Sequence, residues 1–310
     1  MFPGETALRA PASRPLLGRR RPFRARPERM LRLLALLPLP GLSAMLVPVG
    51  WLLWRFGWRA QLVGEGLERC LPERDEAGRR GIARDFYLGL GRLVAEVVHG
   101  ARIAPAELAG RLRFEDDEAV RAALASGRRV LLLAGHHCNW EWLLLRCSTA
   151  FGEPLVAAYK PASRAAADRW LRDLRSRFGA TLVPARELVQ HLLERRGAVR
   201  LLAMVADQSP SAKNEQQVWR PFFGQDTAFF QGPGWIAAKM GYLPVFVALR
   251  PEGRGRYVAR FVPLAGAGER LSPDQVLSAY VRELEAQVRA HPAQYFWAYN
   301  RWKRAKRLYD

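Results

Sequence analysis

Between residues 129 and 262, apolar residues form short continuous runs that are separated by amphipathic stretches. Short apolar runs bounded by glycine or polar residues are typical of strands buried on both faces of a parallel sheet. The predicted strands are residues 129–134, 155–159, 201–206, 243–249 and 257–262. Apolar residues at three- and four-residue steps predict helices at residues 140–150, 163–178, 186–196, 231–240 and 273–290.

This alternation of strands and helices predicts an α/β fold with a mainly parallel central sheet flanked by helices. The polar segment 251–256 joins the last two strands and indicates an antiparallel hairpin. Residues 60–126 are predicted to be helical, with the clearest period at 81–96. We expect one α/β domain over residues 60–310, because neither a linker nor an internal repeat divides this part of the chain.

The first residues follow a different pattern. Residues 1–29 are rich in Arg and Pro, and we expect a disordered basic arm there. Residues 30–59 are predicted to form a membrane-associated helical segment, since residues 33–54 carry no charge and tryptophans lie beside arginines at their end. Prolines within the uncharged stretch favour a kinked span or a helix that lies in the membrane interface. A buried core helix and a cleaved signal peptide are the alternatives.

The charge of the chain narrows the choice of partners. Its 49 Lys and Arg against 29 Asp and Glu give a formal net charge of +20, which favours nucleic acid, anionic lipid or an acidic carrier protein. A basic nucleic-acid-binding protein is an alternative that the charge permits. However, no helix-turn-helix, zinc-finger or RNA-recognition motif is visible in the sequence. The three cysteines, Cys70, Cys138 and Cys147, show no spacing typical of a disulfide framework.

The candidate chemistry lies in the sequence GHHCNWE at residues 135–141. This segment directly follows the predicted strand 129–134, and loops at the carboxyl ends of parallel strands carry the active sites of α/β folds. We expect His136 on the turn and Glu141 in the first turn of the next helix, where the carboxylate can fold back to the imidazole. A carboxylate that accepts from Nδ1 leaves the other ring nitrogen able to remove a proton from a hydroxyl. A purely structural His–carboxylate pair is the alternative, and the spacing matches no metal motif.

The segment 135–141 resembles the HX4(D/E) motif of the lysophospholipid and lipid A biosynthesis acyltransferases, and most closely that of the lauroyl/myristoyl branch. Cys138 stands where that branch usually has glycine. Other blocks of the chain agree with the family in order and spacing. They are residues 159–161, 175–180, 206–210, 221–233 and 291–303. The resemblance covers residues 30–305.

The resemblance implies a glycerol-phosphate-acyltransferase-like fold and an O-acyltransferase. The donor would be a fatty acyl thioester, usually on acyl carrier protein, and the acceptor a hydroxyl of a lipid A precursor. His136 would be the general base and Glu141 its orienting partner, without a metal or organic cofactor. The location would be the bacterial inner membrane, with the catalytic domain on its cytoplasmic face. Another lipid acceptor, such as a lysophospholipid, an ornithine lipid or a glycolipid, is the alternative.

Several polar residues are candidates for substrate binding. Arginine and lysine suit phosphates and acidic carrier proteins, although a solvated helix face is an alternative for each of them. Asp207 follows a predicted strand, so it is expected at the edge of the site or as a helix cap. Backbone amides near Asn139 or a nearby arginine are candidate donors to the oxyanion. The substrate-binding candidates are Lys160, Arg164, Arg175, Arg177, Asp207 and Asn139.

Overall fold

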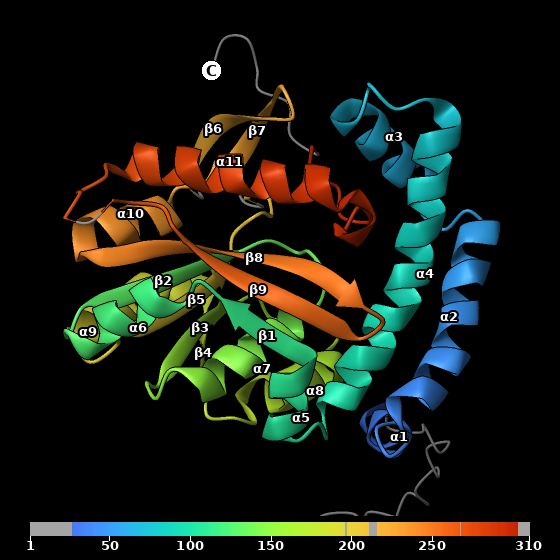
Figure 1. Cartoon of the computed structure of the whole chain (residues 1–310), viewed down its shortest axis with the longest axis horizontal. Helices are drawn as coiled ribbons and strands as arrows, with labels where there is room; N and C mark the ends of the chain where they lie inside the picture. Colours follow the sequence, from blue (N-terminus) through green and yellow to red (C-terminus); the bar gives the residue numbers. More distant parts are fainter. Residues whose placement is uncertain (1–26, 196, 211–215, 267, 303–310) are drawn as a thin grey trace, which may run out of the picture.

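The computed structural model describes residues 27–195, 197–210, 216–266 and 268–302. Its centre is a seven-stranded sheet in the order β1-β9-β8-β2-β5-β3-β4 (Figure 1). The strands are β1 (Leu112–Glu115), β2 (Arg129–Ala134), β3 (Leu155–Tyr159), β4 (Thr181–Pro184), β5 (Leu201–Val205), β8 (Tyr242–Gly253) and β9 (Arg256–Pro263). Only β8 and β9 pair antiparallel within this sheet, so the predicted mainly parallel sheet and its closing hairpin are confirmed.

Helices flank the sheet as predicted. Along the chain they include α6 (Glu118–Ala125), α7 (Trp140–Ala150), α8 (Ala165–Ser176), α9 (Leu188–Glu194), α10 (Gly232–Met240) and α11 (Pro273–Ala290). Figure 1 shows α11 on one side of the sheet and α7 and α8 on the other. Short 3-10 turns precede α9 at Ala185–Glu187 and follow α11 at Pro292–Gln294.

The central strand β2 is buried on both faces. Val130, Leu132 and Ala134 pack into the core formed with α7, whereas Leu131 and Leu133 pack into the core formed with α11. Burying a leucine side chain stabilises a fold by about 1.5–3 kcal/mol relative to leaving it exposed. The continuous apolar run of β2 therefore serves two cores at once, which explains why it shows no polar–apolar alternation.

Three structural features differ from the sequence-based expectations. The region 60–126 is not helical throughout, because it contains the edge strand β1. The edge strand β4 was not expected. A separate antiparallel hairpin of β6 (Gln217–Phe222) and β7 (Gln225–Phe230) packs beside α11. These strands are short or only partly buried, so they lack the continuous apolar run that marks the central strands.

The N-terminal region forms separate helices. The uncharged stretch 33–54 is divided between α1 (Pro27–Leu34) and α2 (Leu39–Arg55), and Pro38 lies at the break. Among the described residues, no single helix is long and apolar enough to cross a membrane. The pair formed by α2 and α3 (Ala60–Cys70) meets that test by length and composition, but it is bent by 82°. A straight span is therefore not found. Most of the expected basic arm, residues 1–26, lies outside the described residues.

The helix α2 packs closely along α4 (Glu76–Gly100) (Figure 1). A Cβ atom on Gly50 would lie 2.2 Å from the carbonyl oxygen of Tyr87, and one on Gly91 would lie 2.3 Å from that of Leu46. Only glycine leaves room for two backbones at this separation. The long helix α4 continues to α5 (Pro105–Arg111), which leads into β1.

Candidate functional site

Two neighbouring parallel strands bring the predicted base and a carboxylate together. Ala134 of β2 is paired in register with Val205 of β5. His136 and Asp207 each lie two residues beyond this pair, at the same carboxyl edge of the sheet. This edge is where α/β folds bind their substrates.

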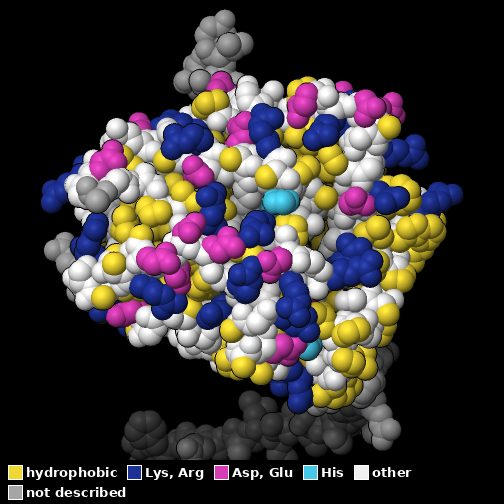
Figure 2. Space-filling view, viewed as in Figure 1, with side chains coloured by type: hydrophobic (Ala, Val, Ile, Leu, Met, Phe, Trp, Pro, Cys, Tyr) yellow, Lys and Arg dark blue, Asp and Glu magenta, His cyan; other side chains and the backbone are white. Residues whose placement is uncertain are grey.

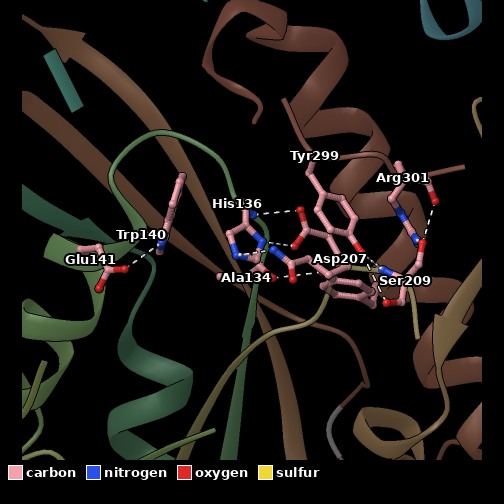
Figure 3. A network of polar contacts seen from close by, with 10 residues as sticks. Ala134, His136, Trp140, Glu141, Asp207, Ser209, Tyr299 and Arg301 are labelled. Atoms are coloured by element: carbon pink, nitrogen blue, oxygen red, sulfur yellow. Dashed lines mark hydrogen bonds and ion pairs between the residues drawn. The ribbon is translucent and has the colours of Figure 1, made fainter. Parts of the chain in front are cut away.

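Asp207 holds His136 through both of its carboxylate oxygens (Figure 3). The ring Nδ1 lies 2.5 Å from Oδ1, and the backbone N–H of His136 donates to Oδ2 at 2.9 Å. Burial raises the pKa of the Asp207 carboxyl, but the charge of His136 and these hydrogen bonds outweigh burial, and the net pKa lies below its usual range. Because a carboxylate only accepts, Nδ1 carries the proton and the neutral ring keeps a lone pair on Nε2.

The expected direct pairing of Glu141 with His136 is wrong. Glu141 accepts two hydrogen bonds from Arg175, with Nη2–Oε1 at 2.6 Å and Nε–Oε2 at 2.8 Å. The indole N–H of Trp140 also donates to Glu141, at 3.1 Å. Figure 3 shows Trp140 between Glu141 and His136, and the two rings meet edge to face with centroids 5.0 Å apart. The first turn of α7 directs the Glu141 carboxylate towards α8, whereas Nδ1 of His136 faces the end of β5.

The Glu141–Arg175 ion pair is largely buried, since the Glu141 side chain is only 6% exposed. Burial lowers the pKa of Arg175. Its hydrogen bonds to Glu141 and the charge of Glu141 raise the pKa by a larger amount, so the net pKa lies above its usual value. Two donors of Arg175 are thus engaged by α7. The pair joins α7 to α8 at the mouth of the site.

Arg175→Met is expected to lower the free energy of unfolding by about 3–5 kcal/mol, because it leaves the Glu141 carboxylate buried without its partner. The double variant Arg175→Met/Glu141→Gln should recover most of this loss, since no uncompensated charge remains. Urea unfolding of purified protein measures both. Arg172→Met, on the exposed face of the same helix, should change stability by less than about 0.5 kcal/mol. Equal stability of the single and double variants would contradict the argument.

Of the other predicted binding residues, Lys160 lies at the cavity, whereas Arg177 and Arg164 lie elsewhere. Arg177 donates to the carbonyl oxygens of Gly100 and Ile103, at 2.7 Å each, so it secures the end of α4 rather than facing His136. Arg164 is exposed at the start of α8. Lys160 is exposed and lines the cavity beside His136.

Asn139 is the N-cap of α7 and is fully buried. Its Oδ1 accepts from the backbone N–H of Trp142 at 2.9 Å, and its Nδ2 donates to Glu96 of α4 at 2.9 Å. Tyr257 donates to the same oxygen of Glu96 at 2.8 Å. Burial raises the pKa of Glu96, although these two hydrogen bonds act in the opposite direction. Asn139 therefore positions the motif loop, and sequence reasoning missed Glu96 because it falls within a regular helical pattern.

Arg301 is a buried cation behind Asp207 (Figure 3). Its Nη1 donates to the hydroxyl of Ser209 at 2.6 Å and to the carbonyl of Ala228 at 2.8 Å. The backbone N–H of Ser209 donates to the Tyr299 hydroxyl at 3.0 Å. The charge of Arg301 also contributes to the low pKa of Asp207. This network fixes the backbone that follows Asp207.

A cavity of about 310 Å³ extends from His136 between the sheet and α7. Its polar rim includes Lys160, Arg175 and Gln208. Its deeper walls are mainly apolar side chains of β2, β3, β5 and α7. These are Leu132, Ala134, Leu143, Leu144, Cys147, Ala157, Ala158, Ala203 and Met204. An apolar cavity with a few polar groups at one end suits a ligand with a long apolar chain and a reactive head.

The three cysteines are free and buried. Burial raises the pKa of the Cys138 thiol well above its usual range and that of Cys147 to about 12, so both are neutral thiols at pH 7. Cys138 adopts a φ of 51°, a backbone conformation that favours the glycine usual at this position of the motif. Among the described residues, no group of three or more His, Cys, Asp or Glu is arranged to hold a metal ion.

Comparison with known proteins agrees with the resemblance of the motif. The family model for bacterial lipid A biosynthesis acyltransferases matches residues 29–304. The chain is 24% identical over 281 residues to the lipid A biosynthesis lauroyltransferase of Escherichia coli strain K12, covering 88% of this chain and 89% of that protein. The match includes the sheet, the flanking helices and every residue of the site described above.

Proposed function

The chain belongs to the bacterial lipid A biosynthesis acyltransferase family, and we propose that it transfers a fatty acyl chain from an acyl thioester to a hydroxyl or hydroxyacyl group of a lipid A precursor. One observation supports this most directly. His136 is braced by a buried carboxylate at the mouth of an apolar cavity. Membership of this family does not support the alternative of a nucleic-acid-binding protein.

The proposed reaction uses His136 as the general base. The acceptor hydroxyl binds at Nε2, which removes its proton as the oxygen forms a bond to the thioester carbonyl carbon. The Asp207 carboxylate stabilises the imidazolium that results. The tetrahedral intermediate then expels the thiolate, and the proton on Nε2 passes to the sulfur. Glu141 is a positioning residue in this scheme, because it acts through Trp140 and Arg175 rather than on the ring.

The apolar cavity is proposed to hold the acyl chain. Its walls expose mainly Leu, Ala and Met side chains, so entry of a chain removes apolar surface from water on both sides. The rim carries the polar residues, including Lys160, where the thioester and the acceptor would meet.

Acyl carrier protein is the proposed donor carrier. Carrier proteins of this kind are acidic, and this chain has a net charge of +20. The exposed Lys160 lines the cavity, and the exposed Arg164 lies four residues further along the chain, at the start of α8. A lysophospholipid, an ornithine lipid or another glycolipid is the alternative acceptor, because the catalytic chemistry is the same for any hydroxyl.

We place the enzyme at the cytoplasmic face of the bacterial inner membrane, with the exposed side of α1 and α2 on the lipid surface. Hydrophobic side chains gather along the right-hand and lower-right edge of Figure 2, where Figure 1 places α1 and α2. Leu33 is 66% exposed and Phe56 is 80% exposed, and Trp51 is exposed between them. The exposed Arg55 lies beside Phe56 on the same segment and suits anionic head groups, whereas Arg59 donates to the carbonyl oxygen of Ala298.

The triple variant Leu33→Ser/Trp51→Ser/Phe56→Ser should bind vesicles with anionic lipid at least about tenfold more weakly, because each apolar side chain contributes on the order of 1 kcal/mol or more when it leaves water. Flotation of the full chain with phosphatidylglycerol vesicles measures this. Val189→Ser/Leu193→Ser removes exposed apolar side chains from α9 and serves as the matched control. Equal flotation of the triple variant and the control would argue against this surface.

The function is tested by mass spectrometry of lipid A from cells with and without the gene. We expect loss of one acyl chain in the deletion and its return with the intact gene. Purified protein should transfer acyl groups from acyl carrier protein to the lipid A precursor that accumulates. Unchanged lipid A together with a missing acyl chain on another lipid would transfer the assignment to the alternative acceptor.

A further inference from the structure

The side-chain amide of Gln208 lies against the nitrogen that is proposed to act as the base. Gln208 Nε2 is 3.3 Å from His136 Nε2, and both residues line the cavity. Gln208 follows Asp207 directly, so one short segment holds both ring nitrogens of His136: Asp207 at Nδ1 and Gln208 at Nε2.

The protonation state of the ring decides what this contact is. Asp207 accepts the proton on Nδ1, so Nε2 of the neutral ring has only a lone pair in the ring plane. The amide N–H of Gln208 therefore donates to Nε2. An acceptor hydroxyl needs the same lone pair to lose its proton, so Gln208 and the hydroxyl compete for one position.

Hydrogen bonds of its two neighbours hold the backbone of Gln208, whereas its side chain lines the cavity. Asp207 on one side is bound to His136, and Ser209 on the other donates to Tyr299 and to the carbonyl oxygen of Arg301. Because Gln208 lines the cavity, a rotation of its side chain would free Nε2 without moving the backbone. The amide then stays within one side-chain length of the reacting atoms.

The negative charge that develops on the thioester carbonyl oxygen would lie within reach of the Gln208 amide. The attacking oxygen must be about 2.6–3.2 Å from Nε2, and the carbonyl oxygen becomes negative one bond beyond the carbon that is attacked. Two other donor side chains of the cavity wall are directed towards Glu141: Trp140 donates its single N–H there, and Arg175 donates through Nε and Nη2. Within the part of the chain that the structure describes, the Gln208 amide has one hydrogen-bond partner, Nε2 of His136, which it gives up when the acceptor arrives.

We propose that Gln208 is a catalytic residue that protects the lone pair of the resting base and then donates to the carbonyl oxygen of the thioester during acyl transfer. This inference rests on the proposed function. In the step, the hydroxyl oxygen bonds to the carbonyl carbon, its proton moves to Nε2, and the carbonyl electron pair moves to the oxygen, where the Gln208 N–H stabilises it. Collapse re-forms the carbonyl, breaks the carbon–sulfur bond, and returns the proton from Nε2 to the thiolate.

The first test is Gln208→Met, which keeps the length of the side chain and removes the donor. We expect kcat of acyl transfer to fall by about 10²–10³-fold, the usual effect of removing one oxyanion donor, with little change in KM and in thermal stability. Gln190→Met, the same change at an exposed position of α9, should leave the rate unchanged. Hydrolysis of the same thioester without a lipid acceptor should fall with transfer, because water attack needs the same donor.

The second test changes the acceptor atom of the hydrogen bond. A dodecanoyl thioester is compared with its dithioester, in which sulfur replaces the carbonyl oxygen and accepts a hydrogen bond poorly. The wild-type protein should lose more rate on this change than Gln208→Met does, because the variant has no donor left to lose. Such non-additivity reports a direct contact between the changed side chain and the changed atom.

The outcomes separate this inference from the proposed function. A wild-type protein without transfer or hydrolysis would overturn the function itself. An active wild type with an equally active Gln208→Met would overturn only the role of Gln208. A loss of transfer with normal hydrolysis would also overturn it, since Gln208 would then contact the lipid acceptor and not the oxyanion.

Discussion

His136→Ala is expected to lower the rate of acyl transfer by about 10³–10⁴-fold, towards the upper end of what a general base contributes. The alanine variant has no group that can take the proton of the acceptor hydroxyl as the ester bond forms. The remaining rate comes from binding and from the donors around the carbonyl oxygen. Steady-state assays with an acyl thioester and a lipid A precursor measure the effect.

His191→Ala is the matched control, because His191 lies on α9 and does not line the cavity. It should transfer acyl chains at the wild-type rate. The melting temperature of His136→Ala should fall, because the Asp207 side chain, only 2% exposed, loses its ring partner, so the rates are compared at a temperature at which the variant is folded. A folded His136→Ala protein with near-normal turnover would refute the assignment of the base.

Asp207→Asn is expected to lower the rate by about 10²–10⁴-fold without changing the size of the side chain. The backbone N–H of His136 needs an acceptor, so the amide oxygen takes that contact and the amide nitrogen faces Nδ1. Nδ1 must then accept, which moves the ring proton to Nε2. A protonated Nε2 cannot remove the proton of the acceptor.

The position of the ring proton is measurable by ¹⁵N NMR of the histidine side chains. We expect the proton on Nδ1 of His136 in the wild type and on Nε2 in Asp207→Asn. Asp173→Asn, a similar change on the exposed face of α8, should alter neither the spectrum nor the rate. An unchanged tautomer combined with a normal rate would exclude Asp207 as the partner of the base.

The low pKa of Asp207 also predicts how the pair responds to acid. A carboxyl whose folded pKa lies below its unfolded value of about 3.9 contributes its full stability above that pH. The contribution is lost as pH falls through the lower, folded value. Protonation of the Asp207 carboxyl should therefore cause no loss of stability between about pH 5 and 8, as measured by thermal unfolding across this range.

The sequence predicts the central part of the fold well because burial on two faces requires continuous apolar runs. The boundaries of β2 and β3 agree with those predicted from this pattern alone. Edge strands such as β1 and β4 have one unpaired side and few buried positions, so their residues do not differ from those of loops. The break before α2 lies at Pro38, as the prolines of this stretch indicated, whereas the close packing of α2 along α4 is a tertiary contact that no local pattern expresses.

The site could be predicted only as far as its local motif. His136 follows from the strand and the loop after it, whereas the identity of its partner depends on which strand lies beside β2. The insertion of β5 between β2 and β3 sets Asp207 next to His136, although these residues are 71 positions apart. Glu141 is closer in sequence, but Arg175 on α8 takes its carboxylate. Motif spacing alone therefore pointed to the wrong carboxylate.

The helix α4 connects the side of the molecule that we propose to face lipid with the loop that carries His136. Gly91 touches the backbone of α2, and Glu96, about 7.5 Å further along the same helix, binds Asn139. A change in the tilt of α2 at the bilayer would move α4, and α4 would then displace the loop that carries His136. The lipid composition or thickness of the membrane would then influence turnover even when substrate concentrations stay constant.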